Sequence, residues 1–166
     1  MSNDYTGQGD SQSVQVMAAP RRKPLALLVD DEPLNRALAK INMKSLEFEI
    51  IEASDGREAL EILAERGTEI GLILTDQNMK DKDGTGMNGD EMLRIAKGRG
   101  LLRENGQTRI MLSTDEEVCS QVTAEGLAHA FLDKVSVRSP GKLAEAVNEA
   151  LAKNGQDTTP SAQSRG

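Results

Sequence analysis

The sequence predicts an α/β fold: a doubly wound, five-stranded parallel sheet covered on both faces by five helices. Two observations predict it. Five short apolar runs recur between residues 24 and 153, and segments with helical periodicity separate them. Near-continuous apolar runs are typical of strands that are buried on both faces. Strands that alternate with helices indicate right-handed crossovers, which place helices on the two faces of the sheet.

The five apolar runs give the expected strands in order. They are residues 25–29 (LALLV), 48–51 (FEII), 70–74 (IGLIL), 110–112 (IML) and, more weakly, 130–132 (AFL).

Apolar side chains at helical spacing predict helices between and after these runs. Residues 116–125 give the least regular pattern. Ser54 or Asp55 can cap the second helix, and Ser139 followed by Pro140 predicts the start of the last one. The apolar stripes are Leu34, Ala37, Leu38 and Ile41; Ala59, Leu60, Leu63 and Ala64; Met92, Leu93 and Ala96; and Leu143, Val147, Ala150 and Leu151.

Composition predicts one folded domain at residues 24–153, with a disordered leader at 1–23 and a disordered tail at 154–166. The chain has 166 residues, and both ends are polar and poor in large apolar side chains. A net charge of −7 and 2% aromatic residues disfavour nucleic-acid binding. A single cysteine and the lack of a long apolar run predict a cytoplasmic protein without a membrane segment.

Charged and hydroxyl side chains follow the predicted strands where each one ends. Asp30 and Asp31 follow the first strand, Asp76 the third, Ser113 the fourth and Lys134 the fifth. In a sheet with the order 2-1-3-4-5, the first and third strands are neighbours, so the three aspartates converge. Clustered carboxylates favour Mg²⁺, and a nearby ammonium and hydroxyl suit a phosphoryl group. The sequence therefore predicts a site for metal and phosphate.

The segments VDDEPLNR, LILTDQNM, IMLSTDEE and AFLDK resemble the receiver domain of response regulators in two-component signalling, a flavodoxin-like fold. The resemblance covers about residues 24–153. It implies that Asp76 accepts a phosphoryl group from a sensor histidine kinase or a histidine phosphotransfer protein. It also implies that Mg²⁺ or Mn²⁺ is held by Asp30, Asp31, Asp76 and the backbone carbonyl of Asn78.

The same resemblance implies a switch. Lys134 would stabilise the transferred charge, Ser113 would turn toward the new phosphoryl group, and Phe131 would follow it. The surface of the fourth helix, fifth strand and fifth helix would then bind a downstream protein. With only a short tail after the last helix, we expect a stand-alone receiver that acts through protein contact, as a phosphorelay shuttle or a direct effector.

The chain departs from the usual receiver pattern at three places. About five extra residues lie within residues 80–86 (KDKDGTG), beside the expected site. Val135 stands where the family has a proline with a cis peptide bond, which predicts a different path for the chain after Lys134. Thr114 replaces a small alanine and would narrow access to the phosphoryl group.

Three alternatives compete with this interpretation. One is a phosphorylation-independent (pseudo-receiver) interaction domain. Another is a calcium loop at residues 81–92, which has oxygen ligands at positions 1, 3 and 5 but Met92 where position 12 needs a glutamate. A phosphatase-type hydrolase needs a second aspartate two residues after its nucleophile, and neither Asp30 nor Asp31 has one. We therefore expect a phosphoacceptor protein, not an enzyme with turnover.

Overall fold

The computed structural model describes residues 19–155 and confirms the predicted parallel sheet, with the strand order β2-β1-β3-β4-β5. The strands are β1 (Leu25–Val29), β2 (Glu49–Ala53), β3 (Ile70–Asp76), β4 (Thr108–Leu112) and β5 (Ala130–Leu132). The helices are α1 (Pro33–Asn42), α2 (Gly56–Arg66), α3 (Gly89–Gly98), α4 (Glu116–Ala124), α5 (Lys134–Arg138) and α6 (Lys142–Lys153).

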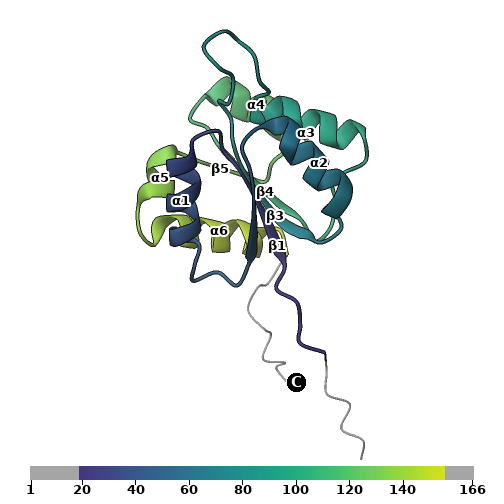
Figure 1. The fold of residues 1–166 in the computed structure, drawn as a ribbon, viewed down its shortest axis with the longest axis vertical. Coiled ribbons are helices and arrows are strands. Elements are labelled where there is room, and N and C mark those ends of the chain that lie inside the picture. The colour runs from purple at the N-terminus through teal and green to yellow at the C-terminus, as the bar shows by residue number, and fades with distance from the viewer. Residues whose placement is uncertain (1–18, 156–166) are drawn as a thin grey trace, which may run out of the picture.

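Helices cover both faces of the sheet, as Figure 1 shows. The helices α2, α3 and α4 pack on one face, and α1, α5 and α6 pack on the other. The β1 strand serves both cores, because Leu25, Leu27 and Val29 lie on one face and Ala26 and Leu28 on the other. This arrangement leaves the carboxyl ends of the central strands free at one edge, where their terminal side chains can meet.

The apolar stripe predicted for α1 does not face the core. Leu34 and Ile41 are 64% and 67% exposed, whereas Asn35 and Ala39 are buried. The helix is rotated because the polar Asn35 turns inward, where it hydrogen-bonds to Glu32 and accepts from Arg138. Hydrophobic periodicity alone cannot detect a buried polar side chain that has such partners.

Residues 19–155 form six helices in place of the predicted five, and the difference lies after β5. The additional helix α5 begins at Lys134, directly after β5, and Ser139 follows its last residue. The predicted cap of the last helix at Ser139 and Pro140 is therefore wrong, since α6 begins at Lys142 after Gly141, which has a φ of 81°. The Asp55 cap is confirmed, because its carboxylate accepts hydrogen bonds from the backbone N–H groups of Arg57 and Glu58.

The predicted disordered ends lie mostly outside the described residues, in 1–18 and 156–166. Residues 19–24 form neither helix nor strand, and α6 ends at Lys153, the residue predicted to end the folded domain. Among the helices of residues 19–155, none has both the length and the apolar character needed to cross a bilayer.

Candidate functional site

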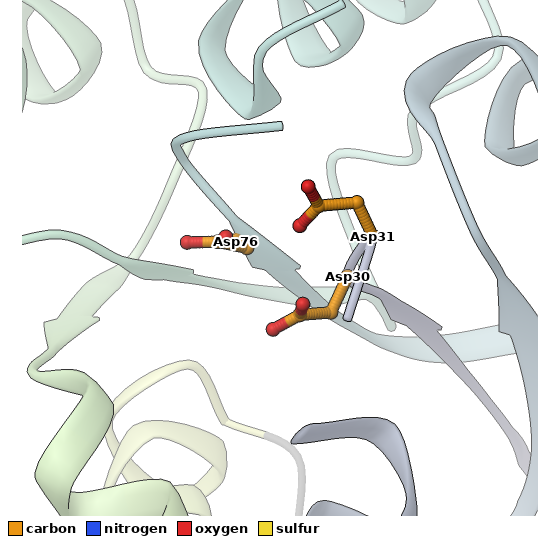
Figure 2. Close-up of side chains that lie close together, drawn as sticks. All are labelled: Asp30, Asp31 and Asp76. Carbon is orange, nitrogen blue, oxygen red and sulfur yellow. The ribbon is translucent and has the colours of Figure 1, made fainter. Parts of the chain in front are cut away.

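Three carboxylates meet at the carboxyl ends of β1 and β3, as the strand order predicts. Asp30 and Asp31 follow β1, and Asp76 is the last residue of the neighbouring β3. One carboxylate oxygen from each lies within 4.8 Å of the other two. Figure 2 shows the three side chains leaving adjacent strand ends. Asp30 and Asp76 are buried, whereas Asp31 is exposed and gives the cluster an opening to solvent.

Lys134 reaches the same place from the first residue of α5. Its Nζ lies 2.8 Å from Asp76 Oδ2. Apart from this ion pair, neither buried oxygen of Asp76 has a hydrogen-bond partner of good geometry in the described part of the chain. The peptide bond between Lys134 and Val135 is trans, and the chain after Lys134 forms a helix. The chain after Lys134 thus follows a helical path with a trans peptide bond, and Lys134 still reaches Asp76.

Burial opposes the charges of this cluster. It raises the pKa of Asp76 above its usual range, while the ion pair with Lys134 acts in the opposite direction. Burial also raises the pKa of Asp30 to about 6, and the neighbouring Asp76 adds to this shift. Although its own burial acts in the opposite direction, the pKa of Lys134 is raised because it bonds to Asp76. The site therefore holds negative charge at a free-energy cost.

Because these carboxylates hold negative charge in buried surroundings, a bound divalent cation would stabilise them. Mg²⁺ binds a few carboxylates and keeps several waters, so a cluster with two buried carboxylates and one exposed one fits it. Of the two Asp76 oxygens, Oδ2 pairs with Lys134, and Oδ1 has no partner of good geometry among residues 19–155, so Asp76 has lone pairs available for a cation. The donor set is all oxygen, which suits Mg²⁺ or Mn²⁺ rather than zinc.

Neighbouring groups hold the Asp30 main chain and side chain in place. The backbone N–H of Glu32 donates to Asp30 Oδ1 at 2.8 Å, and Arg36 donates to the Asp30 carbonyl at 2.6 Å. The amide of Asn35 lies 3.5 Å from the same carboxylate oxygen. Neither Arg36 nor Asn35 is a predicted site residue, because their roles depend on how α1 is rotated.

Beyond β3, Ser113 lies directly after β4, and Phe131 lies in β5. Ser113 follows β4, and its hydroxyl accepts a hydrogen bond of 3.2 Å from the backbone N–H of Asp115. Thr114 is exposed at the rim. Phe131 is half-buried in β5 and lines an open groove of about 450 Å³ beside α4. The structure thus brings the carboxylates and Lys134 together and places the two switch candidates in or directly after the strands beyond β3.

Residues 80–86, which contain the roughly five extra residues, form a loop that closes on itself. The backbone N–H of Asp81 donates to the carbonyl of Thr85, and the Thr85 hydroxyl donates to the carboxylates of Asp81 and Asp83. Met92, the twelfth position of the calcium alternative, is fully buried in α3, so it offers no ligand there.

The sequence interpretation missed Gln77, which fixes the chain between the site and this loop. Its buried side chain exchanges two hydrogen bonds with Asp90, of 2.8 Å and 3.0 Å, at the start of α3. Gly89 passes so close to Asp76 that a Cβ there would lie 2.3 Å from the Asp76 carbonyl oxygen. In the sequence, the only indication of this contact is Gly89 itself, 13 residues after Asp76.

Known protein families and solved structures were compared with this chain, and they agree with the fold described above. The family model for the response regulator receiver domain matches residues 26–148. The chain belongs to this family. Solved structures agree: the receiver domain of an HD domain-containing protein from Pseudomonas fluorescens Pf-5 is 25% identical, with a TM-score of 0.63 over 81% of this chain and 98% of the other. A receiver protein from Pseudomonas putida is 30% identical, with a TM-score of 0.58 over 80% and 98%.

Curated relatives contain a similar segment inside much longer chains. Sensor histidine kinase RcsC of Salmonella typhimurium is 38% identical over 60 residues, which are 36% of this chain and 6% of that protein. Sensor protein EvgS of Escherichia coli is 33% identical over 81 residues, 45% of this chain and 7% of that protein. The receiver therefore corresponds to a small part of each relative's length.

Proposed function

We propose that Asp76 accepts a phosphoryl group from a phosphohistidine in a reaction that depends on Mg²⁺ or Mn²⁺. One observation carries this proposal: Asp76 is a fully buried carboxylate that forms an ion pair of 2.8 Å with Lys134. Among residues 19–155, its oxygens have no other hydrogen-bond partner of good geometry. Such a group is poorly solvated, and it gains from bonding to an incoming phosphorus atom. The membership in a family of phosphoacceptors supports the same assignment.

In the proposed reaction, an Asp76 oxygen attacks the phosphorus in line with the departing imidazole. The new P–O bond forms as the P–N bond breaks, and the histidine nitrogen keeps the electron pair. Lys134 already lies at Asp76 Oδ2, so its ammonium can stabilise negative charge on the phosphoryl oxygens. The protein's contribution is mainly positioning and charge stabilisation.

Asp30, Asp31, Asp76 and the Asn78 carbonyl are the proposed metal ligands. A bound divalent cation would neutralise charge on the carboxylates and on the phosphoryl oxygens. The backbone N–H of Glu32 holds the Asp30 carboxylate in place, while Asp31 remains open to solvent, where an ion would enter.

The proposed output is a change of protein contacts. Ser113 would rotate from the Asp115 N–H toward the phosphoryl group, and Phe131 would turn inward from its groove beside α4. The predicted downstream surface comprises α4, β5 and the last helix, α6, so such a change would alter its shape.

The phosphodonor we propose is a sensor histidine kinase or a histidine phosphotransfer protein. Two curated relatives that contain a similar segment are named a sensor histidine kinase and a sensor protein. A cytoplasmic location, action without nucleic acid or membrane, and the choice between shuttle and effector stay predictions from the sequence.

Intact-protein mass after incubation with acetyl phosphate tests the proposal. We expect wild type to gain one phosphoryl group with Mg²⁺ present and none with a chelator, while Asp76→Asn gains none. The exposed loop variant Asp81→Asn serves as a control and should behave as wild type. No gain in wild type at any Mg²⁺ concentration would contradict the proposal and favour the phosphorylation-independent interaction domain.

A further inference from the structure

The short helix α5 reaches both halves of the acidic site. Lys134, its first residue, bonds Asp76, and Arg138, its last residue, donates a hydrogen bond of 3.1 Å to Asn35 Oδ1 on α1. The two cations are four positions apart, a spacing that puts them on the same side of a helix. Figure 1 shows α5 lying beside α1.

Asn35 connects Arg138 with the carboxylates that follow β1. Its side chain is 4% exposed, and its Nδ2 lies 3.2 Å from Glu32 Oε2 and 3.5 Å from Asp30 Oδ1. The amide nitrogen thus faces two acidic groups, and the amide oxygen faces a guanidinium. Reversing the amide would set its oxygen against the carboxylates and its nitrogen against Arg138, so the partners specify one orientation.

Arg138 holds the amide where it can reach Asp30 as well as Glu32. The Glu32 contact is the shorter one, and Glu32 is exposed at the surface. Without Arg138, the amide would be held from the acidic side only and could follow Glu32 away from Asp30. Asp30 would then lose a donor that limits its rotation, and the three-carboxylate geometry would loosen.

We propose that Arg138 and Asn35 are positioning residues that fix the Asp30 carboxylate for divalent-cation binding, and that α5 thereby couples the metal side of the site to Lys134. This inference rests on the proposed Mg²⁺-dependent function. Groups that orient metal ligands typically change metal affinity by 10- to 100-fold when removed. Because Arg138 acts through Asn35, we expect a smaller change, of about three- to tenfold.

Titration calorimetry with MgCl₂ on the phosphate-free protein measures this directly. We expect Arg138→Ala and Asn35→Ala each to weaken Mg²⁺ binding by about three- to tenfold. The double variant should bind Mg²⁺ about as well as Asn35→Ala, because both residues act along one path. Arg138→Lys keeps a cationic donor and should recover part of the loss.

Asn42→Ala is the matched control. Asn42 also joins α1 to α5, through a hydrogen bond of 2.6 Å from its Nδ2 to the Val137 carbonyl. Within residues 19–155, it makes no hydrogen bond to the three carboxylates of the site. It should lower the melting temperature and change Mg²⁺ affinity by less than about twofold, which separates docking of α5 from positioning of Asp30.

Three outcomes would overturn the inference: unchanged Mg²⁺ affinity in folded Arg138→Ala, an equal loss in Asn42→Ala, or multiplied losses in the double variant. A wild type that binds no Mg²⁺ would overturn it together with the proposed function. If wild type binds Mg²⁺ and the variants behave as expected, but acetyl phosphate adds no phosphoryl group, only the proposed function fails.

Discussion

At the scale of single residues, the site is defined by charges kept in unfavourable surroundings. Asp30 and Asp76 are buried, and burial is the largest cause of the raised pKa of each. Lys134 relieves only part of this cost, since its side chain is 38% exposed and it pairs with one of the two. The buried charges therefore make the metal-free protein less stable than it would be with uncharged groups at these positions. A bound cation can recover part of this lost stability.

The first prediction concerns Asp76→Asn in a chelating buffer. Removing a buried charge whose pKa is raised should increase the free energy of unfolding by about 1 kcal/mol, or roughly 3 °C in melting temperature. Mg²⁺ should stabilise wild type more than the variant, because the cation gains more from three carboxylates than from two. Thermal unfolding followed by circular dichroism measures both effects. A variant that melts below wild type in chelator would contradict this account.

The second prediction concerns pH and Asp30. Its pKa is about 6 in the folded protein and about 3.8 when unfolded, so between these values the folded state binds more protons. The contribution of Asp30 to stability therefore falls as pH rises from about 4 to 6, and its full cost, on the order of 3 kcal/mol, is present at pH 7.

Denaturant unfolding of wild type and Asp30→Asn in chelator isolates this contribution. The difference in unfolding free energy between the two should grow in favour of the variant as pH rises from 4 to 7. Adding Mg²⁺ at pH 7 should reduce the difference. A difference that stays constant across this pH range would show that Asp30 titrates in the folded protein as it does unfolded.

The residues that the sequence could identify are those whose position follows from strand ends. Asp30, Asp31, Asp76 and Lys134 meet because parallel strands end at one edge. Asn35 and Arg138, 103 residues apart, could not be identified in this way. Their contact depends on the rotation of α1 and on a helix after Lys134 that the sequence interpretation did not predict.

At the scale of elements, hydrophobic periodicity predicted where helices occur better than which side they bury. The stripe of α6 is buried as predicted, whereas Leu34 and Ile41 of α1 are exposed. The helix α5 was missed because it has five residues, too few for a periodic pattern, and is held by its Asp133 cap and by α1. Short elements are determined by their contacts, so local sequence carries little information about them.

The third prediction concerns the inserted loop. Because the hydrogen bonds of Asp81, Asp83 and Thr85 are made within the loop, deleting residues 81–85 should leave the fold intact and change the unfolding free energy by less than about 1 kcal/mol. The ion pair of 2.8 Å between Lys80 and Glu91 lies outside the deletion and should persist. Urea unfolding of the deletion variant tests this, and loss of a cooperative transition would show that the loop is structural.

At the scale of the whole molecule, the fold follows from alternating strands and helices, and the site follows from the fold. The order β2-β1-β3-β4-β5 makes β1 and β3 neighbours at the point where the strand order reverses, and the aspartates lie there. The two cores on either side of the sheet hold α4 and α5 in separate layers (Figure 1). A change at the strand ends can therefore reach both layers.

The most direct test of the central claim is to locate the phosphoryl group. An aspartyl phosphate is an acyl phosphate, so borohydride converts the modified residue to homoserine, which peptide mass spectrometry can map. After treatment with acetyl phosphate and Mg²⁺, we expect homoserine at Asp76 alone, and at no position when Mg²⁺ is chelated. Homoserine at Asp30 or Asp31, or a phosphoryl group on His129, would contradict the assignment of Asp76 as the phosphoacceptor.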